Sequence, residues 1–170
     1  MGARLRLCAI FILYYGEKMN LIDKTCCFFG HRDAPNSIKP ELIKAIIELI
    51  EKHGVTNFYV GNNGCFDSLV FSTLKEISAD YPKINYDIVL AYLPKKEPAK
   101  DWRNSIYPDG IESVPKKYCI SWRNNWLINN SRYVICYVAH ITGGAFGFAE
   151  KAKKKGRTVI NLSGIQSLLN

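Results

Sequence analysis

Short apolar runs alternate with amphipathic segments along most of the chain, and this alternation constrains the fold more than any other feature. Apolar residues recur with a helical period between the runs, for example in residues 39–54 and 65–81. Continuously apolar strands joined by helices are typical of a parallel sheet that is covered on both faces. The sequence therefore predicts a single Rossmann-like three-layer α/β domain with a mainly parallel sheet of about five strands. The five predicted strands are residues 24–29, 57–60, 86–93, 132–140 and 158–162.

Two parts of the chain break this alternation. Residues 1–18 contain the basic and apolar stretch "RLRLCAIFILYY", which is too short to span a bilayer and lacks the cleavage motif of a signal peptide. We expect these residues to lie outside the domain, which would occupy residues 19–170. Residues 94–115 hold four of the seven prolines and are predicted to form an exposed loop or lid.

Charge and cysteine content narrow the choice of partner and compartment. The formal net charge of +8 suits an anionic ligand or a polynucleotide, but it also fits a solvated lysine-rich surface. The six cysteines include no C-x-x-C pair, and Cys26, Cys27 and Cys136 fall within apolar runs. We therefore expect reduced cysteines in the core, no metal site, no cofactor and a cytoplasmic location.

Glycine-containing loops follow three of the predicted strands, at residues 30–33, 61–64 and 140–144. Parallel strands end at one edge of the sheet, where ligands of such folds bind. Glycine allows close approach of the backbone, and helix N-termini offer free N–H groups to anions. We therefore expect a ligand site at this edge, formed by Gly30, His31, Arg32, Gly61, Asn62, Gly64, Asp67, Trp122, Arg123, Thr142, Gly143 and Gly144.

Several of these candidates also have a purely structural interpretation. Arg32 suits a surface ion pair as well as an anion contact. Asp67 falls in the first turn of a predicted helix, where the helix dipole stabilises a carboxylate, but it is also placed to contact a ribose or a base. Trp122 suits core packing and stacking on a base equally. Glu150 is spaced for an i,i+4 pair with Lys154 on a helix surface.

Four stretches together resemble the SLOG superfamily, and within it the YpsA-like branch of bacteria and their mobile elements. They read "FFGHRD", "FYVGNNGCFD", "SWRNNWLINNSRYVICYV" and "TGGAFGFAEKAKKKGRTVINL", and the resemblance covers about residues 25–162. It implies a Rossmannoid fold that binds nucleotides or nucleotide-derived ligands. Relatives in the superfamily include cytokinin-activating phosphoribohydrolases, the DNA-processing protein of natural transformation and sensors of ADP-ribose-like signals. Because such proteins often associate, the resemblance also implies a homodimer.

One motif departs from the pattern of the enzymes in this superfamily. The phosphoribohydrolases carry P-G-G-x-G-T-x-x-E, in which the glycines hold phosphate and the glutamate serves catalysis. Here Gly143 and Gly144 match the paired glycines, Thr142 replaces the proline, and an extra residue precedes the G-x-x-E of Gly147 and Glu150. The resemblance therefore supports a phosphate-binding loop more strongly than a catalytic Glu150.

Three functional hypotheses follow. We rank first the binding of a nucleotide or ADP-ribose-like ligand by a sensor or sequestering domain. The second is an N-glycosidase acting on nucleoside 5′-monophosphates, in which Glu150 or Asp67 would stabilise an oxocarbenium-like transition state. The third is nucleic-acid binding, which the basic charge and the aromatic residues favour. A polynucleotide needs a continuous basic groove, and the lysines concentrate at one helix end and in the proline-containing loop. We therefore expect a small molecule, rather than nucleic acid or a membrane, as the partner.

Overall fold

The computed structural model describes residue 17, residues 19–93 and residues 104–164. The predicted extension at residues 1–18 therefore lies almost entirely outside the described residues. So does the first part of the predicted loop, residues 94–103. Among the described residues, no helix combines the length and the apolar character that a membrane crossing requires.

Within the described residues, six parallel strands form one sheet in the order β4-β3-β2-β1-β5-β6. The predicted α/β class is thus confirmed, with one strand more than expected. The additional strand is β4, which pairs with Ile88 and Val89 at the sheet edge. Its two residues are too few to produce an apolar pattern, so the sequence indicated only a loop there. The strands are β1 (Thr25–Gly30), β2 (Asn57–Val60), β3 (Asn85–Val89), β4 (Ser105–Ile106), β5 (Tyr133–Tyr137) and β6 (Thr158–Asn161).

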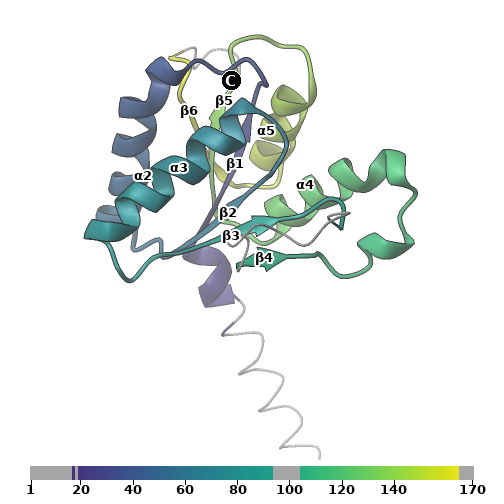
Figure 1. Ribbon diagram of the computed structural model, residues 1–170, viewed down its shortest axis with the longest axis horizontal. Coiled ribbons are helices and arrows are strands. Elements are labelled where there is room, and N and C mark those ends of the chain that lie inside the picture. The colour runs from purple at the N-terminus through teal and green to yellow at the C-terminus, as the bar shows by residue number, and fades with distance from the viewer. Residues whose placement is uncertain (1–16, 18, 94–103, 165–170) are drawn as a thin grey trace, which may run out of the picture.

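Helices cover both faces of this sheet (Figure 1). The alternation of side chains along β1 separates two cores: Cys26 and Phe28 pack with α2 and α3, and Cys27 and Phe29 pack with α4 and α5. Short 3-10 helices precede α2 and α4. The helices are η1 (Asn36–Ile38), α2 (Lys39–His53), α3 (Cys65–Asp80), η3 (Ile111–Ser113), η4 (Lys116–Tyr118), α4 (Cys119–Asn129) and α5 (Gly144–Lys154).

The helix ends explain how the sequence directs the chain around the sheet. Helix α2 begins with Pro40 in its first turn and ends at Gly54, whose φ of 65° is a left-handed cap. Helices α3 and α5 each follow a glycine with positive φ, 126° at Gly64 and 92° at Gly143, and neither has a side-chain cap. Among the described residues, no side chain therefore caps the first backbone N–H groups of α3 and α5.

Strand β1 lies between β2 and β5, so the connections after β1 and β5 lead to opposite faces of the sheet. Such a reversal of strand order opens a crevice at the carboxyl ends of the strands, where ligands of open α/β sheets bind. The three glycine-containing loops predicted from the sequence follow strands that end at this edge. The topology therefore places them around one position.

Candidate functional site

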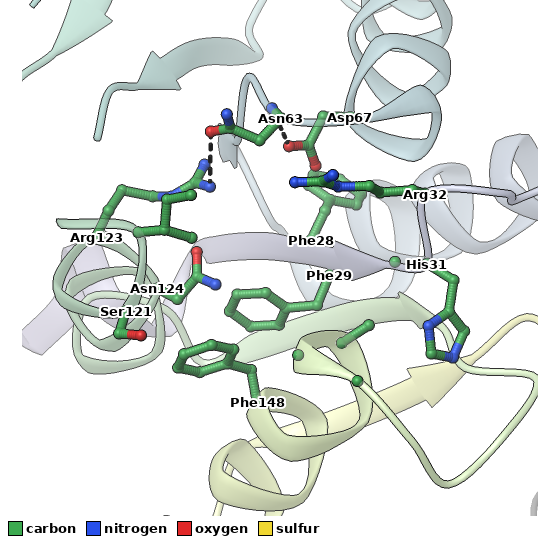
Figure 2. Close-up of a pocket in the computed structure, with 15 residues that line it drawn as sticks. Phe28, Phe29, His31, Arg32, Asn63, Asp67, Ser121, Arg123, Asn124 and Phe148 are labelled. Carbon is green, nitrogen blue, oxygen red and sulfur yellow. Dashed lines mark hydrogen bonds between the residues drawn. The ribbon is translucent and has the colours of Figure 1, made fainter. Parts of the chain in front are cut away.

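A cavity of about 440 Å³ opens at this edge of the sheet, between the ends of β1 and β2 and the starts of α3, α4 and α5. Figure 2 shows its walls: arginine, asparagine and aspartate side chains on one side and two phenylalanine rings on another. Its size is within the roughly 300–1,000 Å³ of small-molecule sites. The lining residues are Phe28, Phe29, Gly30, His31, Arg32, Asn63, Asp67, Ile120, Ser121, Arg123, Asn124, Gly143, Gly144, Ala145 and Phe148.

Arg123, on α4, is a buried cation with few partners. Its side chain is 3% exposed. It donates from Nη1 to the Val89 carbonyl at 3.4 Å and from Nη2 to Asn63 Oδ1 at 3.3 Å, both long hydrogen bonds. Its Nε has no partner, and the guanidinium forms no ion pair among the described residues. Asp67 acts on the pKa of Arg123 as a nearby opposite charge but forms no ion pair with it, so the buried guanidinium is incompletely paired and this position favours an anion.

Asp67 lines the cavity from the first turn of α3. Its Oδ2 accepts a hydrogen bond from the Asn63 backbone N–H at 2.8 Å. Burial raises the pKa of this carboxyl, while the charge of Arg123 and the Asn63 N–H act in the opposite direction. Asp67 and Arg123 both pack against Gly61, where a Cβ would overlap Asp67 Oδ2 and Arg123 Nη1. Glycine at position 61 is therefore required by the two side chains above it.

His31 follows β1 and is largely buried, with 7% of its surface exposed. Its ring stacks on that of His140, with centroids 3.7 Å apart and an interplanar angle of 21°. Burial lowers the pKa of His31, and the charge of His140 lowers it further. The Nε2 atom is buried and has no hydrogen-bond partner among the described residues. This histidine stack joins the loop after β1 to the loop after β5.

The rim of the cavity also contains hydrogen-bond donors. Arg32 is exposed, and its guanidinium extends across the mouth toward Asp67 (Figure 2). Gly143 and Gly144 at the start of α5 also line the cavity, without a side-chain cap over the helix N-terminus. The helix dipole and free N–H groups there favour a negative charge. Two guanidinium groups and one helix N-terminus thus surround the same space.

Several lining residues were not predicted from the sequence. Phe29 of β1 and Phe148 of α5 stack with centroids 5.7 Å apart and form an apolar wall. Asn63, Ser121 and Asn124 add polar groups. The one available signal was position: Asn63 and Asn124 each adjoin a predicted site residue. Phe148 resembled an ordinary core residue of an amphipathic helix.

The structure brings together seven of the predicted residues and separates the others. Gly30, His31, Arg32, Asp67, Arg123, Gly143 and Gly144 line the cavity. Gly61 lies beneath it, and Asn62 and Gly64 belong to the same loop without lining it.

Three further candidates lie outside the lining for identifiable reasons. The Thr142 hydroxyl forms a hydrogen bond with His140 Nδ1 at 2.9 Å. Trp122 is 43% exposed and lies beside Gly110, outside the lining of the cavity. Glu150 lies further along α5, 3.9 Å from Lys154 Nζ. Glu150 thus has the i,i+4 placement beside Lys154 that its structural interpretation predicted.

Of the comparisons with known proteins, the one with solved structures found matches. No protein-family model and no curated protein matches the chain. DNA processing protein A (DprA) from Streptococcus pneumoniae matches with a TM-score of 0.61 and 18% identity, over 88% of this chain and 54% of that one. A structure of DNA processing protein A from Helicobacter pylori, described for its single-stranded DNA binding mode, matches with a TM-score of 0.57 and 18% identity, over 85% of this chain and 67% of that one.

The chain has the fold of the Rossmann domain of DprA proteins. It spans about half the length of the pneumococcal protein, and identities this low establish the fold alone.

These neighbours contradict the functional ranking from the sequence. A nucleotide-derived small molecule was expected as the partner, and nucleic acid was ranked below it, but both matched structures are DNA-processing proteins and one is described as binding single-stranded DNA. The ranking was wrong because it relied on where lysines occur along the chain. It gave too little weight to Arg32 and Arg123, which were both predicted to belong to the site and which border the same cavity.

Proposed function

We propose that this domain binds single-stranded DNA, with a backbone phosphate held in the cavity at the carboxyl edge of the sheet. The observation that carries the proposal is the buried guanidinium of Arg123, which lines the cavity without an ion pair among the described residues. The shared fold with DprA proteins, one of which is described as binding single-stranded DNA, supports the same partner.

The groups around the cavity suit a phosphodiester. Arginine offers a planar set of donors that matches phosphate oxygens. Arg123 provides one such set from inside the cavity and Arg32 another from its rim. The uncapped N-terminus of α5 at Gly143 and Gly144 adds backbone N–H donors. We propose that the strand is contacted by Arg32, by Arg123, by the backbone at Gly143 and Gly144, and by His31.

The surface beside the cavity favours a strand over a mononucleotide. Tyr118 and Trp122 are 54% and 43% exposed and lie one helical turn apart, from η4 into α4. The ammonium of Lys117 lies 4.8 Å from the centre of the Tyr118 ring. Exposed aromatic rings next to cations are what single-strand binders use to stack bases and follow the backbone. We propose that bases outside the cavity stack here.

Two finer assignments also remain proposals. Membership of the YpsA-like branch rests on the four sequence stretches alone. A cytoplasmic location is supported by the free cysteines of the described core, of which Cys27 and Cys136 have pKa values raised to about 12 by burial and so have little thiolate reactivity.

Fluorescence anisotropy with a labelled thymidine oligonucleotide of about 12 residues, within the site sizes of single-strand binders, tests the proposal. Arg32→Gln and Arg123→Gln should each weaken binding roughly tenfold, because a charge-assisted contact is lost. Each should also reduce the slope of log affinity against log salt by about 0.7, the value for one phosphate on a single strand.

Lys44→Gln is the matched control. Lys44 is exposed on α2, which covers the face of the sheet opposite to α4 and α5 and contributes no residue to the cavity lining. This variant removes one positive charge without touching the cavity, and its affinity should stay close to that of the unmodified protein. Equal losses in all three variants would indicate a non-specific charge effect and contradict the proposed site. Absence of binding by the unmodified protein would contradict the function itself.

A further inference from the structure

Two histidines meet at the wall of the cavity. His31 lines the cavity in the loop after β1, and its ring stacks on that of His140, in the loop after β5, with ring centroids 3.7 Å apart. One edge of the His31 ring lies against the start of α5, because a Cβ built on Gly143 would lie 3.9 Å from the Cε1 and Nδ1 atoms of His31. A titratable ring therefore adjoins the helix N-terminus at which we propose that phosphate binds.

In the protein alone, the surroundings of His31 oppose a positive charge on its ring. Burial lowers the pKa of His31 and the charge of His140 lowers it further, while a hydrogen bond to the His140 backbone and the charge of Asp33 act in the opposite direction. The start of α5 adds the positive end of a helix dipole beside the ring. At neutral pH the His31 ring is therefore uncharged.

The other charged groups around His31 and the cavity come from three elements. Arg32 follows His31 in the loop after β1, where Asp33 adds one negative charge. Asp67 lines the cavity from α3 and Arg123 lines it from α4, whereas the part of α5 in the lining carries no titratable side chain. Within the described lining, two guanidinium groups thus accompany one carboxylate. A bound phosphate brings the negative charge that an imidazolium at this position lacks.

We propose that His31 takes up a proton from the solvent when a phosphate of the strand binds, so that DNA affinity rises as the pH falls. A neutral imidazole has one donor and one acceptor nitrogen, whereas an imidazolium has two donors. A phosphodiester offers acceptors only, so it favours the imidazolium both by its charge and by hydrogen bonding. This inference rests on the proposed binding of single-stranded DNA and adds to it a regulation of the same site by pH.

The test measures the affinity of a labelled thymidine strand of about 12 residues by fluorescence anisotropy at a series of pH values. The series runs from about pH 8 to about pH 5.5, a range that includes the ordinary histidine pKa and in which thymine does not titrate. We expect the affinity to rise roughly tenfold, which corresponds to a rise of one unit in the pKa of His31 on binding. His31→Gln keeps a polar side chain without a titrating group, and its affinity should stay nearly constant over the series.

Calorimetry in two buffers with different ionisation enthalpies counts the protons directly. The unmodified protein should take up protons when it binds the strand at a pH near the ordinary histidine pKa, and His31→Gln should take up fewer. Circular dichroism at each pH checks that each protein is folded. An NMR titration of the His31 ring protons, with and without the strand, gives the same answer without a variant, since the pKa of His31 should be higher in the complex.

Two further variants separate His31 from other titratable groups. His53 is exposed at the end of α2, which contributes no residue to the cavity lining, so His53→Gln should keep the pH dependence. Asp67 is the carboxyl group in the described lining and is a second candidate for proton uptake. Asp67→Asn removes that candidate and should also keep the pH dependence.

Each outcome decides a different point. Affinity independent of pH in the unmodified protein would overturn the proton uptake and leave DNA binding intact. A pH dependence that persists in folded His31→Gln, or that is lost in Asp67→Asn, would overturn the role of His31. If His31→Gln does not fold, an NMR titration in which the strand leaves the pKa of His31 unchanged would overturn it. Absence of binding at every pH would overturn the proposed function instead.

Discussion

Asp67 and Arg123 meet above the backbone of Gly61, where a Cβ would overlap Asp67 Oδ2 and Arg123 Nη1. The two residues come from different helices, α3 and α4, and the side chain and backbone of Asn63 contact one each. Neither group forms an ion pair among the described residues. The pair is therefore positioned by packing against bare backbone, and both groups remain available to a ligand.

Gly61→Ala should disturb both groups at once. We expect it to lower the free energy of unfolding by about 1–3 kcal/mol, as for overpacked sites, and to weaken DNA binding. Chemical denaturation and anisotropy measure the two effects. Gly147→Ala is the control, since Gly147 lies within α5 and a Cβ added there would meet no neighbouring atom within 4 Å. It should stabilise the protein by about 0.5–1 kcal/mol through helix propensity and leave binding unchanged.

Arg123→Met should separate stability from binding. The methionine keeps the buried stem and removes a charge that forms no ion pair among the described residues. We expect the free energy of unfolding to change by less than about 1 kcal/mol, because the cost of burying the guanidinium is removed together with its two long hydrogen bonds and its attraction to Asp67, while DNA affinity falls. Urea denaturation and anisotropy on the same preparation check this. A large loss of stability would mean that Arg123 is a structural residue.

His31 should make the protein less stable in mild acid. Its pKa is lowered from the ordinary value of 6.5 by burial and by His140, with Asp33 opposing. The folded state therefore disfavours the imidazolium. The stability that neutral His31 contributes is present above the pKa that His31 has in the unfolded state. It is lost as the pH falls through the lower pKa that His31 has in the folded state.

His31→Phe should abolish that part of the pH dependence, because the ring remains and the titrating group does not. Denaturant midpoints compared between about pH 7.5 and pH 5, on either side of the ordinary histidine pKa, give the difference for each protein. The same loss of stability in both proteins would show that other groups are responsible.

Trp122→Ala should weaken binding of a long strand by roughly tenfold, the effect of removing one base-stacking ring. Its effect on a strand of two nucleotides should be small, because Trp122 lies outside the cavity. Binding should also quench tryptophan fluorescence in the unmodified protein more than in the variant. Equal affinity of both proteins for the long strand would exclude stacking at this position.

Much of the architecture was predictable, because it depends on short-range patterns. The apolar runs and helical periods located five strands and the main helices, and Gly54 marked the end of α2. The glycine loops indicated the edge at which the cavity lies, because parallel strands must end there together. Seven predicted residues line the cavity for this reason.

The remainder depended on contacts between distant segments. A wall made from Phe29 and Phe148 requires knowing that α5 covers β1, and neither residue differs from a core phenylalanine in sequence. Trp122 is 43% exposed and lies beside Gly110, in a part of the chain that lacked periodicity, so its exposure was not evident from the sequence. The choice of partner failed for a different reason: Arg32 and Arg123 were both predicted to belong to the site, but the distribution of lysines was taken as evidence against nucleic acid.

The central place of β1 in the sheet has a consequence for biosynthesis. The cavity needs β1 and α3 from the first half of the chain and α4 and α5 from the second half. A nascent polypeptide leaving the ribosome therefore has no complete ligand pocket until α5 has been translated. If the proposed function holds, fragments released before α5 has been translated should not compete for DNA.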